Sequence, residues 1–219
     1  MKKQFTNVIV IDASSSMEDK KSSVISGLKE LFQDIKSRAK ADKEVDFKTI
    51  VVKFSSHDDV KVIVNAFGGK SLTKGLAESY TTSGMTALYD AIGTAFGLVA
   101  HTEEHVFVNI LTDGEENNSK IYDQARIKSL IGEAKKKGWA VTFMGTTEEA
   151  INSAVGLGVS RGNTLSFAKS VGGMNKMSKA RSNMSAMYYA SSVGASAGGA
   201  SVDVNNLTDT LDDELKDGK

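Results

Sequence analysis

Short apolar runs alternate with amphipathic helices through most of the chain, and this alternation limits the folds that the chain can adopt. The first run, residues 5–11 (FTNVIVI), is rich in β-branched side chains, as expected of a strand buried on both faces. Residues 20–41 then place apolar side chains three and four positions apart, which is typical of an amphipathic helix. A strand followed by a helix is therefore the first unit of the fold.

The same pattern continues to about residue 190. Strands are expected at 45–56, 59–67, within 105–117, at 139–146 and at 163–168, and helices at 86–100, 125–138, 148–158 and from 171 onward. His57 and Asp58 separate the second and third strands, which predicts a hairpin, and residues 68–85 are expected to form a loop. Strands that alternate with helices predict an α/β fold with a mostly parallel sheet, one antiparallel edge strand and helices on both faces.

Composition excludes several classes of function. The chain has no cysteine, which excludes disulfides, iron–sulfur clusters, thiolate zinc sites and a cysteine nucleophile. Lysine plus arginine equals aspartate plus glutamate at 27 each, so no overall charge attracts nucleic acid or an anionic membrane. No apolar run reaches the roughly 20 residues of a membrane span, and no signal peptide is evident. We therefore expect a cytoplasmic protein without a nucleic-acid or membrane partner.

The last third of the chain contains a methionine-rich helix and an acidic end. Four methionines, an arginine and a tyrosine recur at helical spacing, and we interpret them as a core face rather than a partner groove: Met174, Met177, Arg181, Met184, Met187 and Tyr188. We expect residues 1–190 to form one domain, followed at 191–219 by a flexible Gly/Ala/Ser linker and an acidic tail that is solvated and disordered.

The first strand ends in a D-x-S-x-S sequence formed by Asp12, Ser14 and Ser16. Alternate residues of such a loop can point the same way, so that one carboxylate and two hydroxyls converge. Hard oxygen donors without nitrogen or sulfur suit Mg²⁺, Mn²⁺ or Ca²⁺. The alternative is that a serine caps the next helix and Asp12 accepts backbone N–H groups at its start.

Two later residues have a similar place in the pattern. Thr86 lies at the entrance of a helix, and Asp113 follows a buried strand in the sequence T-D-G. Each has a simpler interpretation, Thr86 as a helix cap and Asp113 with Gly114 as a turn. In a parallel sheet, however, the two strands that end in aspartate would present both carboxylates at the same edge, where ligands bind.

D-x-S-x-S, a later threonine and a later T-D-G, in this order, resemble the von Willebrand factor type A (vWA) domain over roughly residues 5–190. The resemblance implies a Rossmann-like, doubly wound sheet of about six strands. It also implies a metal-ion-dependent adhesion site, in which Ser14, Ser16 and Thr86 bind the metal through their hydroxyls and Asp12 and Asp113 act largely through water. Many members have glycine where this chain has Ser15, which puts the affinity of the site in doubt.

A site of this kind implies a non-enzymatic module. Mg²⁺ or Mn²⁺, with Ca²⁺ less expected, would bridge the site to an aspartate or glutamate of a partner protein. The chain looks like a stand-alone cytoplasmic version, as found in bacteria and phages, and an AAA+ ATPase is a frequent companion of bacterial members.

Two other functions stay open. One is a metal-dependent hydrolase, although we expect no histidine near the motifs to act as a base, and His57, His101 and His105 are too scattered for a zinc site. The other is self-association, in which the acidic tail supplies the carboxylate that the metal site accepts.

Overall fold

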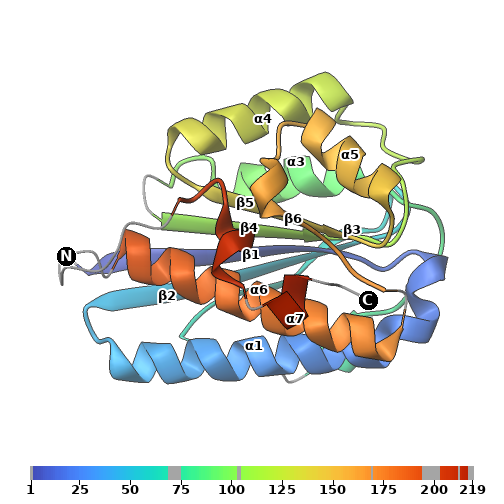
Figure 1. Cartoon of the computed structure of the whole chain (residues 1–219). Coiled ribbons are helices and arrows are strands. Elements are labelled where there is room, and N and C mark those ends of the chain that lie inside the picture. Colours follow the sequence, from blue (N-terminus) through green and yellow to red (C-terminus); the bar gives the residue numbers. More distant parts are fainter. Residues whose placement is uncertain are drawn as a thin grey trace.

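The computed structural model describes residues 2–68, 75–102, 105–168, 170–193, 203–211 and 213–216. Within these ranges, six strands form one sheet in the order β3-β2-β1-β4-β5-β6 (Figure 1). The strands are β1 (Lys3–Asp12), β2 (Val45–Phe54), β3 (Val60–Phe67), β4 (His105–Leu111), β5 (Ala140–Gly145) and β6 (Thr164–Ser166). All neighbours pair in parallel except β2 and β3, which form the antiparallel hairpin at one edge.

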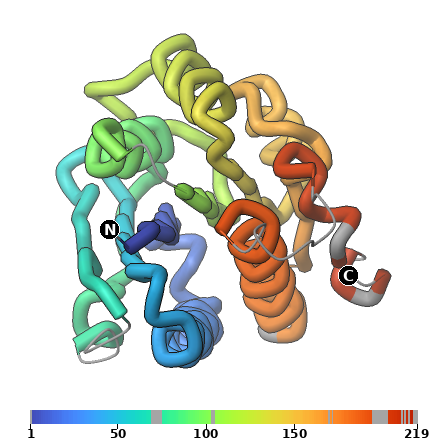
Figure 2. Tube along the Cα trace, turned by 90° about the vertical axis from the view of Figure 1, so that its left-hand side faces the viewer, coloured from blue at the N-terminus to red at the C-terminus, as the bar shows by residue number. Residues whose placement is uncertain are grey.

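Two layers of helices cover the sheet (Figure 1). The first layer consists of α1 (Lys21–Ala41) and α6 (Val171–Ser192), and the second of α3 (Leu88–Val99), α4 (Gln124–Lys136) and α5 (Glu148–Gly156). Figure 2 shows the sheet from its side, between these two layers. The fold class expected from the sequence is confirmed, including the antiparallel edge strand.

Residues 8–11 of strand β1 are apolar without interruption because both faces of the strand are buried there. Successive side chains of a strand point to opposite faces, so Val8 and Val10 enter the core under α3 while Ile9 and Ile11 enter the core under α1 and α6. All four are at most 2% exposed. From β1 the chain moves first to β2 on one side and later to β4 on the other, so the strand order reverses between β1 and β4.

Helix α6 confirms most of the methionine prediction. Met174, Met177 and Met184 are buried, whereas Met187 is 36% exposed. The helix lies against α1 at Gly27, where a Cβ atom would come within 2.1 Å of the Ser178 hydroxyl. Glycine at this position therefore allows the two helices to approach closely.

The C-terminal residues that the structure describes differ from the expected solvated tail. Leu207 and Leu211 are buried in the core beside α6. The side-chain amide of Asn163 donates to the Val204 carbonyl at 2.8 Å and accepts from the Leu207 N–H at 2.9 Å. The disorder prediction is thus wrong for 203–211, because two leucines among the acids have an apolar surface to cover. The predicted Gly/Ala/Ser linker lies mostly in 194–202, outside the described residues.

Shorter helices complete the described parts of the chain. They are the 3₁₀ turns η1 (Ser15–Lys20), η2 (Arg161–Asn163) and η4 (Leu207–Thr210) and the short helices α2 (Leu76–Ser79) and α7 (Asp213–Lys216). Helix α2 lies within the expected loop 68–85, of which 69–74 are outside the described residues. Across the part of the chain that the structure describes, no helix has the length and apolar character needed to cross a membrane.

Candidate metal centre

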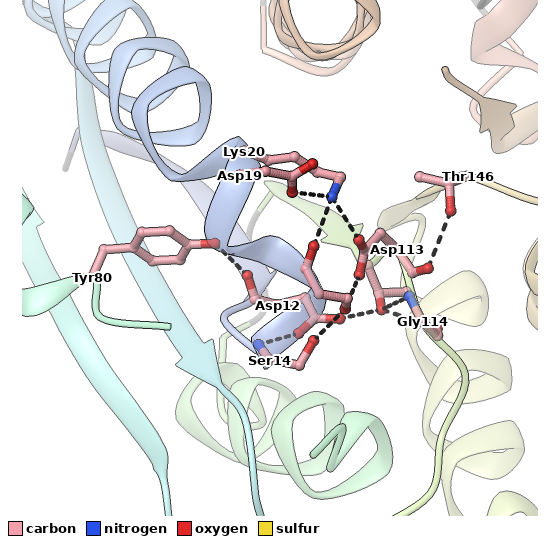
Figure 3. A network of polar contacts seen from close by, with 10 residues as sticks. Asp12, Ser14, Asp19, Lys20, Tyr80, Asp113, Gly114 and Thr146 are labelled. Atoms are coloured by element: carbon pink, nitrogen blue, oxygen red, sulfur yellow. Dashed lines mark hydrogen bonds and ion pairs between the residues drawn. The ribbon is translucent and has the colours of Figure 1, made fainter. Parts of the chain in front are cut away.

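The two aspartate-bearing strand ends lie side by side. Ile11 of β1 pairs with Leu111 of β4, so the residues that follow each strand emerge at the same edge of the sheet, at the reversal of strand order. Asp12 is fully buried there. Its Oδ1 accepts from the Ser14 N–H at 2.7 Å and its Oδ2 accepts from the Thr112 hydroxyl at 2.5 Å (Figure 3). Burial raises the pKa of Asp12 above its ordinary value and outweighs these hydrogen bonds, so the site favours a nearby positive charge.

The two serines converge with Asp113 as the sequence predicts. The Ser14 and Ser16 hydroxyl oxygens are 3.0 Å apart, and the Ser16 hydroxyl donates to Asp113 Oδ1 at 2.6 Å. Ser14 precedes η1 but its side chain makes no capping hydrogen bond, so the alternative of a capping serine is not realised. The backbone N–H that Asp12 accepts from Ser14 does agree with the other half of that alternative.

Thr86, in the segment just before α3, lies beside the T-D-G sequence and so also belongs to the candidate site. It is 4% exposed and lies just before α3, whose cap position is Ala87. Its N–H donates to Asn117 Oδ1 at 2.9 Å, and its carbonyl accepts from the Asn117 N–H at 3.0 Å. A Cβ atom on Gly114 would lie 3.3 Å from the Thr86 hydroxyl oxygen, so the glycine of T-D-G leaves room for this side chain. Among the described residues, that hydroxyl has no hydrogen-bond partner.

Backbone hydrogen bonds join the D-x-S-x-S loop to the segment before Thr86. Ser83 N–H donates to the Ala13 carbonyl at 2.8 Å, and Ser15 N–H donates to the Gly84 carbonyl at 3.3 Å. Gly84 adopts a left-handed conformation with φ of 72°. Ser15 begins η1, so its backbone is helical and glycine is not required there.

Tyr80 holds the backbone at the start of the D-x-S-x-S loop. Its hydroxyl donates to the Asp12 carbonyl at 2.5 Å (Figure 3). Burial and the neighbouring carboxylates raise the pKa of Tyr80 far above its ordinary value, so the phenol stays protonated and remains a donor. No local pattern predicts this contact, because it joins residues 68 positions apart.

Lys20 is the main component of the site that the sequence did not predict. Its side chain is 6% exposed, and its ammonium lies 3.1 Å from Asp113 Oδ2, 2.6 Å from the Ser16 carbonyl and 2.5 Å from Asp19 Oδ1 (Figure 3). Burial lowers the pKa of Lys20, but the hydrogen bonds with Asp19 and Asp113 outweigh it, and the pKa lies above its ordinary value. Lys20 is therefore a buried cation at the candidate metal ligands.

Two acids that sequence analysis did not assign hold the loop after Asp113. Glu116 accepts the N–H groups of Tyr89, Asn118 and Ser119 at 2.7 to 2.9 Å. Asp90, on α3, accepts the N–H groups of residues 120–122 at 2.8 to 2.9 Å. These carboxylates fix the Asp113 loop to the start of the helix that follows Thr86.

The residues present fit a divalent cation. The five predicted residues supply two carboxylates and three hydroxyls, all hard oxygen donors. Asp113 Oδ2 is buried and accepts no well-aligned hydrogen bond from a described residue, although it faces the Lys20 ammonium. No cluster of three or more histidine or acidic side chains in the described ranges could hold a metal alone. The hydroxyls of Ser14, Ser16 and Thr86 would therefore be needed.

Comparison with known proteins identifies the family. The model of the von Willebrand factor type A domain matches residues 8–193. The chain belongs to this family. No curated protein matches the sequence.

Solved structures agree with this vWA assignment at the level of fold. The pilus adhesin SpaC from Lactobacillus rhamnosus GG superimposes with a TM-score of 0.67 at 14% identity, over 85% of this chain and 30% of SpaC. The vWF domain of the pilus tip protein Mfa5 from Porphyromonas gingivalis gives 0.67 at 10% identity, over 93% and 99% of the two chains. Proximal thread matrix protein 1 of the mussel byssus gives 0.58 at 18% identity, over 83% and 46%. The chain thus spans 30% of SpaC and 46% of the byssus protein.

Proposed function

We propose that this vWA domain is a non-enzymatic module that binds a protein partner through a divalent ion held at a metal-ion-dependent adhesion site. Asp12, Ser14, Ser16, Thr86 and Asp113 would hold Mg²⁺ or Mn²⁺, with Ca²⁺ less expected. The observation that carries the proposal is the convergence of these five side chains, from three separate segments, at the edge where the strand order reverses.

The donor set explains why such a site would bind rather than catalyse. An ion held mainly by neutral hydroxyls keeps much of its positive charge, and a partner's aspartate or glutamate can complete its coordination shell. The partner has access because Ser15 and Ser16 are exposed and Met85, next to Thr86, is 48% exposed. Asp12 itself is held by two buried hydroxyls, that of Thr112 at its carboxylate and that of Tyr80 at its backbone carbonyl.

No observation favours the hydrolase alternative. Glu116, a candidate base near the site, accepts three backbone N–H groups. His57 does lie closer to the motifs than we expected, because its ring contacts Asn118 at 3.2 Å and Asn118 contacts Met85. That expectation is corrected, but His57 has no hydrogen bond to any of the five candidate ligands.

The proposal also includes predictions about the partner protein, the cellular location and the origin of the chain. An AAA+ ATPase partner and a stand-alone bacterial or phage origin rest on the sequence resemblance alone, and a cytoplasmic location rests on the composition and hydropathy of the sequence. The pilus adhesins among the similar structures do not favour a cytoplasmic location. Self-association through the acidic tail has no added support, since the described residues 203–211 pack on their own chain.

Calorimetric titration of chelator-treated protein with MnCl₂ and MgCl₂ tests the metal site. We expect one ion per chain, a raised melting temperature, and at least 30-fold weaker binding in Asp113→Ala. Asp58→Ala, at an exposed acid in the hairpin, is the matched control and should bind as the native protein does. Unchanged melting curves at millimolar concentrations of both metals would contradict the proposal.

Selection from a random peptide library, with Mn²⁺ or with EDTA, tests the partner class. Peptides enriched with Mn²⁺ should contain aspartate or glutamate and should lose binding when that residue becomes asparagine or glutamine. Enrichment that is equal in EDTA would exclude metal-bridged recognition.

A further inference from the structure

Lys20 places a buried positive charge directly on a candidate metal ligand. Its three ammonium contacts are all oxygen atoms, from Asp19, Asp113 and the Ser16 carbonyl, at 2.5 to 3.1 Å. The contacts with Asp19 and with the Ser16 carbonyl are hydrogen bonds, and the contact with Asp113 Oδ2 is an ion pair. The side chain is 6% exposed, which means that the contact is screened only weakly by solvent.

The contact divides the Asp113 carboxylate between two kinds of partner. Oδ1 accepts from the Ser16 hydroxyl, and Oδ2 faces Lys20 (Figure 3). Ser16 is likewise shared, because its hydroxyl contacts Ser14 and Asp113 while its carbonyl accepts from Lys20. A divalent ion held by Ser16 and Asp113 would therefore share its ligands with a like charge, and like charges at such short range in a buried site repel strongly.

The chain has a reason to keep a cation there. Asp12 is fully buried and Asp113 is 5% exposed, and both would be costly to bury as uncompensated charges. Lys20 ends η1, the turn that begins directly after Ser14 and contains Ser16, so the chain brings this positive charge to the site together with the ligands.

We propose that Lys20 is an intramolecular competitor of the divalent ion, an ammonium that neutralises Asp113 in the metal-free protein and gives up that contact when the ion binds. This inference rests on the proposed function, because it concerns the same site. Lys20 lowers the apparent metal affinity and stabilises the metal-free domain. The domain thereby folds without metal and needs a higher concentration of the ion to fill the site than it would without Lys20.

Metal titration of three variants tests the competition. Lys20→Met removes the charge at similar length, Lys20→Gln removes it while keeping a polar end, and Lys29→Met removes an exposed lysine on α1 as the control. With MnCl₂ followed by calorimetry, we expect both Lys20 variants to bind at least tenfold more tightly than the native chain and Lys29→Met. Without metal, both Lys20 variants should melt at lower temperature, and saturating Mn²⁺ should remove that difference.

Each result separates this inference from the proposed function. Native protein that binds Mn²⁺, together with Lys20 variants that bind it equally or more weakly, overturns the competition and leaves the metal site intact. Absence of Mn²⁺ binding in the native chain and in every variant overturns the proposed function itself. If Lys20→Met does not fold, the Lys20→Gln comparison decides. Loss of the Lys20 ammonium signal in ¹H–¹⁵N spectra on addition of MgCl₂ is the direct readout that we expect, and a signal unchanged at saturation overturns the competition.

Discussion

Two lysine–aspartate pairs, each with a buried lysine, lie at the same edge of the sheet, one at the candidate metal centre and one in the β2–β3 hairpin. Lys20 faces Asp113 at 3.1 Å, and Lys53 faces Asp59 at 2.9 Å. Lys53 pairs in register with Ile11, so it emerges one residue before the strand end that carries Asp12. Both lysine side chains are at most 6% exposed.

The charge around the two pairs is opposite. Asp59 receives two ammonium groups, from Lys53 and from Lys61, as well as the Ser55 hydroxyl at 2.8 Å. Lys53 also donates to the carbonyl and hydroxyl of Thr81, both at 3.1 Å. Lys20, in contrast, contacts two carboxylates, those of Asp19 and Asp113. The carboxylate of Asp12 belongs to the same hydrogen-bonded network. Among the groups in direct contact, ammonium groups outnumber carboxylates at the hairpin pair and carboxylates outnumber the ammonium at the site, so the site is the more favourable of the two for a second cation.

The largest expected effect comes from breaking the hairpin pair with Asp59→Asn. Lys53 would stay buried with no carboxylate opposite it, and such a change typically costs about 3 kcal/mol of unfolding free energy. Urea denaturation measures this loss, with the exposed Asp58→Asn as the control. The Mn²⁺ affinity should stay within about twofold, because the pair is separate from the metal ligands. A fivefold or greater change in that affinity would show that the two pairs are coupled.

The contribution of the hairpin pair to the stability of the native chain should depend on pH in the acid range. Burial is the largest influence on Asp59 and raises its pKa, but Lys61, Lys53 and Ser55 together lower that pKa to about 2, from its ordinary value of 3.8. The stabilisation is therefore complete above the unfolded pKa of 3.8 and is lost as pH falls from there through about 2. Urea unfolding between pH 5 and pH 2 should show a loss of about 2 kcal/mol from this group. If Asp59→Asn lost as much stability between pH 5 and pH 2 as the native chain does, the loss would not come from Asp59.

Thr86→Val tests the candidate metal centre without changing either lysine–aspartate pair. Its hydroxyl has no hydrogen bond to described residues, so the stability of the metal-free domain should change by less than about 1 kcal/mol. The Mn²⁺ affinity should fall about tenfold, which corresponds to about 1.4 kcal/mol. Thr94→Val, at a half-buried threonine on α3, the helix that follows Thr86, serves as the control. Equal Mn²⁺ binding in the two valine variants would remove Thr86 from the ligand set.

The smallest effect is expected from Ser15→Gly, which restores the residue that many family members have. Ser15 begins η1 with a helical backbone, and its N–H can still donate to Gly84 after the change. Glycine in a helical position costs up to about 1 kcal/mol, and the Mn²⁺ affinity should stay within about threefold. Tighter binding by tenfold or more in calorimetry would mean that Ser15 restricts the site.

The sequence predicted the fold well because burial on both faces leaves a clear trace in β1, β2 and β4. Asp12, Ser14 and Ser16 could be grouped from local spacing, and Asp113 could be added because neighbouring parallel strands end at the same edge of the sheet. Thr86 joined them only through the family resemblance. Lys20 could not be predicted, since a lysine at a helix start usually points to solvent and nothing local indicates that it folds back onto Asp113. The packed tail was missed for a similar reason, because Asn163, which holds Val204 and Leu207, lies more than 40 positions away.

The carboxylates of Asp90 and Glu116 determine how a partner would meet this domain. Together they accept six backbone N–H groups from residues 89 and 118–122, so the loop after Asp113 is already ordered before a partner binds. The entropy of ordering that loop is lost during folding rather than on association. Differences in affinity among partners should then appear mainly in dissociation rates, with association rates nearly constant.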